Sequence, residues 1–220
     1  MYCGSDRSGF TLLEMAASLA IIGTLALIIV PIAINKLEQS KVTRAVGDVR
    51  GIATALAGLA KDVTQEKVGK NKAHTVTRLL FEGPGNTPRD SDSNAIYYAA
   101  GSIWASIKAS TVADADIGTL HDNIIVNNLD GDVNVDETTN GEDYPSTWGG
   151  PYLIEPRPDP WGNKYVVLVQ GIREGVQAGG SADVYGWVIS AGPNGKLETK
   201  PTGTDLGGDD IGLILAKGAK

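Results

Sequence analysis

The clearest pattern in the chain is an apolar run near its start. From Met15 to Ile34 the sequence contains no charged residue. A helix of that length, rising about 1.5 Å per residue, crosses a hydrocarbon core about 30 Å thick. Glu14 stands at the front edge of the run, after a short apolar stretch that starts at Phe10. An unpaired carboxylate deep in a membrane costs roughly 2.5–3.5 kcal/mol, so Glu14 is predicted to need a partner.

The helical pattern continues beyond Pro31. Apolar residues recur at three- to four-residue spacing, with polar residues mainly between them. They are Leu37, Val42, Val46, Val49, Ile52, Leu56, Leu59 and Val63. This spacing predicts one long helix, apolar in its first half and amphipathic in its second, where it packs under a soluble domain. Pro31 lacks a backbone N–H and is predicted to kink or locally loosen the helix.

The rest of the chain predicts a domain of short, mixed elements. Residues 64–94 are polar and punctuated by Gly and Pro, with a short apolar patch at 79–81, which predicts a loop containing one helical turn. Apolar spacing predicts short helices over 96–107 and 117–125. The β-rich runs 165–169 and 184–189 predict two strands. The fold class is therefore α+β, a long N-terminal helix packed against a small C-terminal antiparallel β-sheet with loop-rich insertions.

Charge and composition exclude several classes of function. The formal net charge is −7, and acidic residues concentrate between Asp90 and Asp143, which argues against nucleic acid as a partner. Cys3 is the one cysteine and His74 and His121 are the two histidines, so a transition-metal centre is not expected. No nucleophile elbow, phosphate-cradling glycine motif or histidine-containing triad is present, and the chain is not predicted to be an enzyme.

The N-terminus resembles the prepilin signal of type IV pilins and type II secretion pseudopilins. The resemblance is carried by Gly9-Phe10-Thr11-Leu12-Leu13-Glu14 and the apolar run with Pro31 inside it. It implies that a membrane-embedded prepilin peptidase cuts between Gly9 and Phe10 and methylates the new amino terminus of Phe10. It also implies that Glu14 pairs with the N-terminal amine of a neighbouring subunit during filament assembly. An ordinary single-span anchor is the alternative, and it explains the length of the run but not Gly9 or Glu14.

The C-terminal part resembles the major pseudopilin of type II secretion. The matching residues are Gly150-Pro151-Tyr152-Leu153, Asp159-Pro160-Trp161-Gly162-Asn163-Lys164-Tyr165, Ser190-Ala191-Gly192-Pro193-Asn194-Gly195 and Gly208-Asp209-Asp210-Ile211. The resemblance implies a pilin-like fold with four parts. They are a leader over 1–9, a transmembrane and assembly half of the helix over 10–34, an amphipathic half over 35–63, and a periplasmic globular domain over 64–220.

The same resemblance implies a structural calcium ion in the last loop. The implied ligands are a main-chain carbonyl near Ala191, the Asn194 side chain, Asp209 and Asp210, all of them hard oxygen donors. Asn194 stands where the family has aspartate, so one negative charge is missing. The alternative is a simple Asn-Gly turn with solvated acids. A second acidic stretch, Asp130 to Asp136, alternates like an EF-hand loop but has Val135 where the turn needs glycine.

Together these patterns predict a structural subunit of a pilin-like filament. The most favoured function is the major pseudopilin of a type II secretion system, and the alternative is a type IV pilin that forms a surface pilus. The implied partners are further copies of the chain, minor pseudopilins, the inner-membrane secretion platform and the prepilin peptidase. The implied location is the bacterial inner membrane, crossed once, with the globular domain in the periplasm.

Overall fold

The computed structural model describes residues 9–63, 79–82, 85–90, 117–119, 124–127, 147–155, 157–169, 172 and 185–216. It contains one helix, α1 (Leu12–Val63), and seven strands among these residues. The strands are β1 (Leu79–Glu82), β2 (Arg89–Asp90), β3 (Ile117–Thr119), β4 (Tyr165–Leu168), β5 (Gly186–Ser190), β6 (Lys196–Leu197) and β7 (Ile211–Ala216). The chain divides into two compact units, 1–41 and 42–220, which are described separately.

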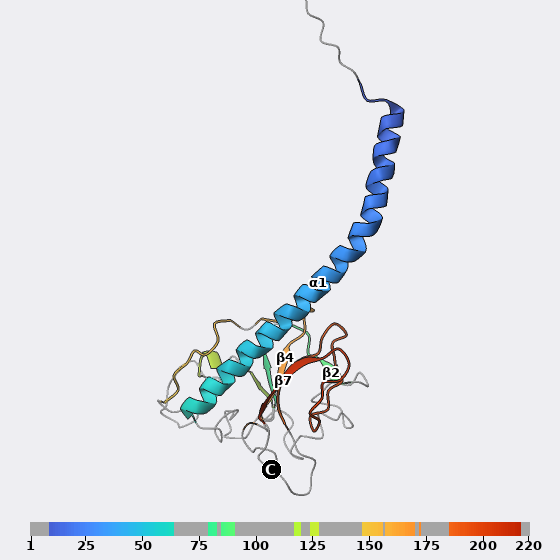
Figure 1. Ribbon diagram of the computed structural model, residues 1–220. Coiled ribbons are helices and arrows are strands. Elements are labelled where there is room, and N and C mark those ends of the chain that lie inside the picture. The colour runs from blue at the N-terminus through green and yellow to red at the C-terminus, as the bar shows by residue number, and fades with distance from the viewer. Residues whose placement is uncertain are drawn as a thin grey trace, which may run out of the picture. The chain divides into compact units, whose positions relative to one another are not determined.

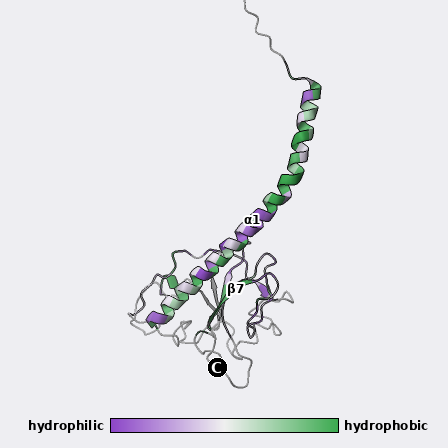
Figure 2. Ribbon diagram, viewed as in Figure 1, coloured by the Kyte–Doolittle hydropathy of each residue, from purple (hydrophilic) through white to green (hydrophobic). Residues whose placement is uncertain are grey.

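In the first unit, α1 presents its apolar side chains to the surroundings. Large apolar residues are exposed along it from Leu12 to Leu37, and Figure 2 shows this part of α1 as mostly hydrophobic. Part of α1 is long and apolar enough to cross a membrane, and none of that window is buried. A helix with an apolar surface on all sides needs a non-aqueous environment, either lipid or other helices.

In the second unit, five strands form one sheet in the order β3-β1-β4-β5-β7. β1, β4, β5 and β7 pair antiparallel, and β3 lies parallel to β1 at the edge. The pairing joins distant parts of the sequence, as Leu79 opposite Leu168 illustrates. β2 and β6 pair in a separate two-stranded parallel sheet. Figure 1 shows the C-terminal part of α1 beside strands β4 and β7.

The core lies between the amphipathic part of α1 and one face of the main sheet. Val49, Ile52, Leu56, Leu59 and Val63 of α1 are buried in one cluster with alternate residues of the central strands, Tyr165, Val167 and Val188. The opposite face carries a second cluster of Val166, Leu168, Trp187, Ile189, Ala191 and Leu197. Successive side chains of a strand point to opposite faces, so β4 and β5 contribute to both clusters and are buried throughout.

The structure confirms the α+β fold, the continuous helix to Val63 and the two predicted strands. Two predictions were wrong. Residues 79–82 form strand β1 inside the segment predicted as a loop, and 117–119 form strand β3 rather than the start of a helix. Ile124 and Ile125, the next described residues, lie in a helical turn. Both strands are short and pair with partners far away in the sequence, so local pattern gave no signal for them. The predicted helix over 96–107 lies outside the described residues.

Candidate assembly and ion-binding sites

The start of α1 is closed by a reciprocal hydrogen-bonded cap. Glu14 Oε2 accepts hydrogen bonds from the Thr11 backbone N–H at 2.9 Å and from Thr11 Oγ1 at 2.8 Å. Thr11 Oγ1 in turn accepts a hydrogen bond from the Glu14 backbone N–H at 3.2 Å. This arrangement is a capping box, which satisfies donors that the first turn of a helix leaves without intrahelical partners.

The cap gives Glu14 a partner within its own chain. The sequence predicted that this carboxylate needs a partner, but it did not identify Thr11. The signal was present, because a threonine three residues before a glutamate at the start of an apolar run is the pattern of a capping box. Gly9 and Phe10 lie immediately before the cap, and Phe10 is exposed. The predicted cleavage point, between Gly9 and Phe10, therefore lies directly before the cap that holds the Glu14 carboxylate.

Pro31 lies inside α1, and the helix is continuous on both sides of it. The predicted kink stays a prediction.

The predicted ion ligands meet around two turns, at 191–195 and 207–210. The Asn194 backbone N–H donates to Asp209 Oδ2 at 3.1 Å, and Asn194 Nδ2 donates to Glu198 Oε2 at 3.1 Å. Asn194 Oδ1 accepts the Lys196 N–H at 2.6 Å. Gly192 has a φ of 60°, and a Cβ there would strike the main-chain oxygen of Asp209. Glycine therefore lets the two turns approach closely.

Asp210 connects the turn at 207–210 to the two residues that follow strand β6, Glu198 and Thr199. Its Oδ2 accepts the backbone N–H groups of Glu198 at 2.9 Å and Thr199 at 2.6 Å. Burial raises the pKa of the Asp210 carboxyl to about 6, against its ordinary 3.8, even though these donors act in the opposite direction. The two N–H groups therefore hold the Asp210 carboxylate in place, while its burial makes the charged form energetically costly.

Two oxygens of this loop have no hydrogen-bond partner. Asp209 Oδ1 and Asp210 Oδ1 are both buried and unpaired. An orphaned buried carboxylate oxygen is expensive, and a cation supplies the missing contact. Among the described residues no three Asp, Glu, His or Cys side chains are grouped closely enough to hold a metal ion alone. An ion here would therefore also need carbonyl oxygens, such as that of Ala191.

Glu198 is the residue of this region that the sequence analysis missed. Its carboxylate lies against Gly208, where a Cβ would collide with Oε2, and it binds the Asn194 amide. The sequence offered one indication of its role, because Glu198 follows Asn194 by four residues and a turn can bring two such side chains together. Glu198 supplies a negative charge close to the position where Asn194 lacks one. The alternating acids of 130–136 lie outside the described residues.

The segment 159–163 is hydrogen-bonded to the end of strand β5 and to the turn at 191–195, mainly through Asp159. Its buried carboxylate accepts hydrogen bonds from Ser190 Oγ at 2.6 Å and from the Asn163 N–H at 2.8 Å. Asn163 Nδ2 donates to the carbonyl oxygen of Gly192 at 3.1 Å. The two matching motifs of the C-terminal part are therefore joined by buried hydrogen bonds, and Asp159 has a structural role.

Comparison with known proteins gives two findings. The family model of the prokaryotic N-terminal methylation motif matches residues 4–30, so the chain carries the motif of the prepilin class of proteins. The chain is also 46% identical over 51 residues to the type II secretion system core protein G of Pseudomonas aeruginosa. That stretch is 23% of this chain and 36% of the relative, so the chain matches about a third of the relative's length. No solved structure matches the chain. The motif, the relative and the α+β fold support a pilin-like subunit.

Proposed function

We propose that this protein is the major subunit of a type II secretion pseudopilus. The observation that carries the proposal is the start of α1. A capped carboxylate stands five residues after Gly9, and an exposed apolar helix follows it and continues into a folded domain. This arrangement suits a chain that waits in the inner membrane with its globular domain in the periplasm and then stacks with copies of itself. The proposed role is structural, with minor pseudopilins and the inner-membrane platform as further partners.

In the proposed mechanism, prepilin peptidase cuts after Gly9 and methylates the amine of Phe10. The new ammonium group and the carboxylate of Glu14 are each expensive inside a membrane or a helix bundle, and each offers the other a charge-assisted hydrogen bond. Before assembly, Thr11 hydrogen-bonds Glu14 and lowers the cost of keeping it there. In the filament, the amine of a neighbouring copy exchanges for the Thr11 donors and sets the register.

Two substitutions at Glu14 separate its two roles. Glu14→Gln keeps the capping box, because glutamine accepts the same hydrogen bonds at this position, but it removes the charge. Glu14→Ala removes both. We expect both variants to be cleaved and inserted normally and to lose filament assembly. The measurement is filament yield by sedimentation and electron microscopy, beside immunoblots of processing. If Glu14→Gln assembles like the wild type, charge pairing is not the organising contact.

The similarity to core protein G favours a secretion pseudopilus over a surface pilus. Long extracellular fibres built from this chain at its native level, with no effect of its deletion on protein secretion, would reverse that preference.

We further propose that the turns at 191–195 and 207–210 bind a structural calcium ion. Support comes from the unpaired Oδ1 atoms of Asp209 and Asp210 and from the hard-oxygen chemistry of the neighbouring groups. Asp209, Asp210, the Asn194 side chain and the Ala191 carbonyl would hold the ion, and Glu198 would add charge. A bound calcium ion would fix two turns that contribute few residues to the core.

A further inference from the structure

Asn194 and Glu198 form a side-chain pair at the two turns of the proposed calcium site. Asn194 Nδ2 donates a hydrogen bond to Glu198 Oε2 at 3.1 Å, while Asn194 Oδ1 accepts the Lys196 N–H at 2.6 Å. An aspartate at position 194 would have no N–H to donate and would place a second negative charge against Glu198. The amide of Asn194 therefore holds a carboxylate that an aspartate at the same position would repel.

Two glycines make room for Glu198 on the second turn. A Cβ at Gly208 would collide with Glu198 Oε2, and a Cβ at Gly207 would strike the main-chain oxygen of Glu198. Gly208 also has a φ of 52°, a conformation that favours glycine. The Glu198 N–H donates to Asp210 Oδ2 at 2.9 Å. These contacts bring the Glu198 carboxylate against the turn that carries Asp209 and Asp210.

That turn has two carboxylate oxygens in need of a contact. Asp209 Oδ1 and Asp210 Oδ1 are buried without a hydrogen-bond partner, and Asp210 is only 6% exposed. As they lie in the structure, the acidic side chains of the described residues are not grouped closely enough to hold a metal ion. Glu198 is exposed, and its carboxylate has one hydrogen-bond partner among the described residues, Asn194. Its side chain is therefore the one that can rotate toward an ion.

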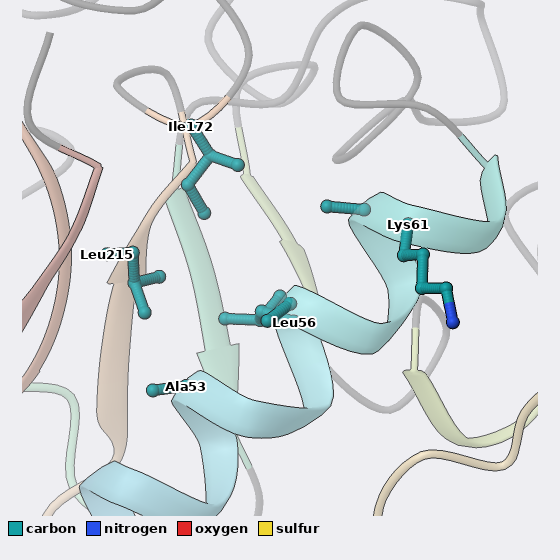
Figure 3. Close-up of a pocket in the computed structure, with 7 residues that line it drawn as sticks. Ala53, Leu56, Lys61, Ile172 and Leu215 are labelled. Atoms are coloured by element: carbon teal, nitrogen blue, oxygen red, sulfur yellow. The ribbon is translucent and has the colours of Figure 1, made fainter.

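Two hollows of the same domain do not offer a cation a comparable place. Figure 3 shows one of them, an apolar hollow between Leu56 of α1 and Leu215 of β7, in which the one charged side chain, Lys61, is itself a cation. Asp48 and Glu155 line the other hollow, but each already pairs with an arginine. Among the described residues, the buried carboxylate oxygens without a partner lie only at the two turns.

We propose that Glu198 is the third carboxylate ligand of the calcium ion and that Asn194 is a positioning residue that directs it there. Asn194 Oδ1 has a second lone pair and can still contact the ion, but it brings no charge. The pair thus replaces a single aspartate, with the negative charge moved four residues along the chain. The inference rests on the proposed calcium site and specifies which side chain supplies the charge that Asn194 lacks.

The test relocates the charge in the detergent-solubilised full-length chain and measures calcium affinity by isothermal titration calorimetry. Glu198→Gln can still accept the Asn194 amide but has no charge, so it should weaken calcium binding by roughly 10–100-fold. Adding Asn194→Asp to Glu198→Gln returns a carboxylate to the site and should recover most of the lost affinity. The matched control, Asp205→Asn, removes an exposed carboxylate from the loop between Glu198 and Asp209 and should leave the affinity unchanged.

The outcomes separate this inference from the calcium site itself. Thermal melts in chelator establish that each variant is folded before affinities are compared. Wild-type affinity in Glu198→Gln would show that this carboxylate does not bind the ion, and the calcium proposal would stand without it. A double variant that binds no better than Glu198→Gln would also overturn the inference, because the charge would not be interchangeable between the two positions. A folded wild-type chain that binds no calcium would refute both proposals.

Discussion

At the scale of single residues, two carboxylates explain most of the chemistry. Glu14 is satisfied by its own chain through Thr11, so an unassembled subunit does not leave a bare charge in the membrane. The donors of Thr11 are neutral, whereas the ammonium group of the proposed assembly carries a positive charge and adds a Coulomb attraction to its hydrogen bond with the carboxylate. Asp210 is different, because it is buried, its pKa is raised, and one of its oxygens has no partner. We propose that a cation completes each site, the ammonium group of a neighbouring copy at Glu14 and calcium at Asp210.

If the proposed calcium site exists, Asp210 links the stability of the protein to both pH and calcium. Its folded pKa of about 6 exceeds the ordinary 3.8, so this group's contribution to stability is fully present below 3.8 and is lost as pH rises through 6. With chelator, the detergent-solubilised protein should therefore melt at a lower temperature at pH 7 than at pH 5. Calcium should raise the melting temperature more at pH 7, because protons compete with it at pH 5.

The measurement is a set of thermal melts with chelator or calcium at both pH values. Asp210→Asn should reduce the pH difference and the calcium response, whereas Asp205→Asn, at an exposed carboxylate, should change neither. The absence of any calcium shift would leave the two turns as ordinary turns, and equal shifts at both pH values would mean that calcium does not compete with protons for Asp210.

At the scale of elements, α1 shows what sequence pattern can and cannot predict. Its full length followed from apolar spacing alone, because the same residues that repeat at helical intervals, such as Ile52, Leu56 and Leu59, are those buried against the sheet. Strands β4 and β5 followed from their β-rich composition. Strands β1 and β3 did not, because they are fixed by pairing with distant segments. For the candidate sites, Glu198 and its contact with Asn194 were not predicted, because the sequence alone does not show which side chains a folded turn brings together.

The two parts of α1 should respond differently to the same substitution. Leu59 is fully buried, and Leu59→Ala should lower the free energy of unfolding by about 2–5 kcal/mol. Leu37 is 63% exposed, and Leu37→Ala should change it by less than about 0.5 kcal/mol. Urea unfolding of the detergent-solubilised protein, followed by tryptophan fluorescence, measures both. Equal effects would contradict the packing of the second part of α1 against the sheet.

At the scale of the whole molecule, one helix combines a part that is apolar enough to cross a membrane with a part that is buried against a sheet. The apolar part of α1 supplies a surface that only lipid or other helices can cover. A subunit that moves from lipid into a filament exchanges one apolar environment for another, so the transfer does not expose the helix to water.

Processing of the N-terminus makes a prediction about the mass of the mature protein. Protein purified from bacterial membranes should lack residues 1–9 and carry one methyl group on Phe10. Intact-mass and peptide mass spectrometry measure both changes. Gly9→Leu should block the cut, because the proposed cleavage follows this glycine, and should leave the full-length chain inserted in the membrane. A native chain that keeps its first nine residues and still polymerises would contradict the proposed mechanism.

The central claim is that Glu14 pairs with the freed amine of a neighbouring copy, and cryo-electron microscopy of the assembled filament tests it most directly. The account predicts the methylated Phe10 nitrogen of one copy within about 4 Å of the Glu14 carboxylate of another, the distance of an ion pair. A filament in which Glu14 still binds only its own Thr11, with the neighbouring amines elsewhere, would contradict it.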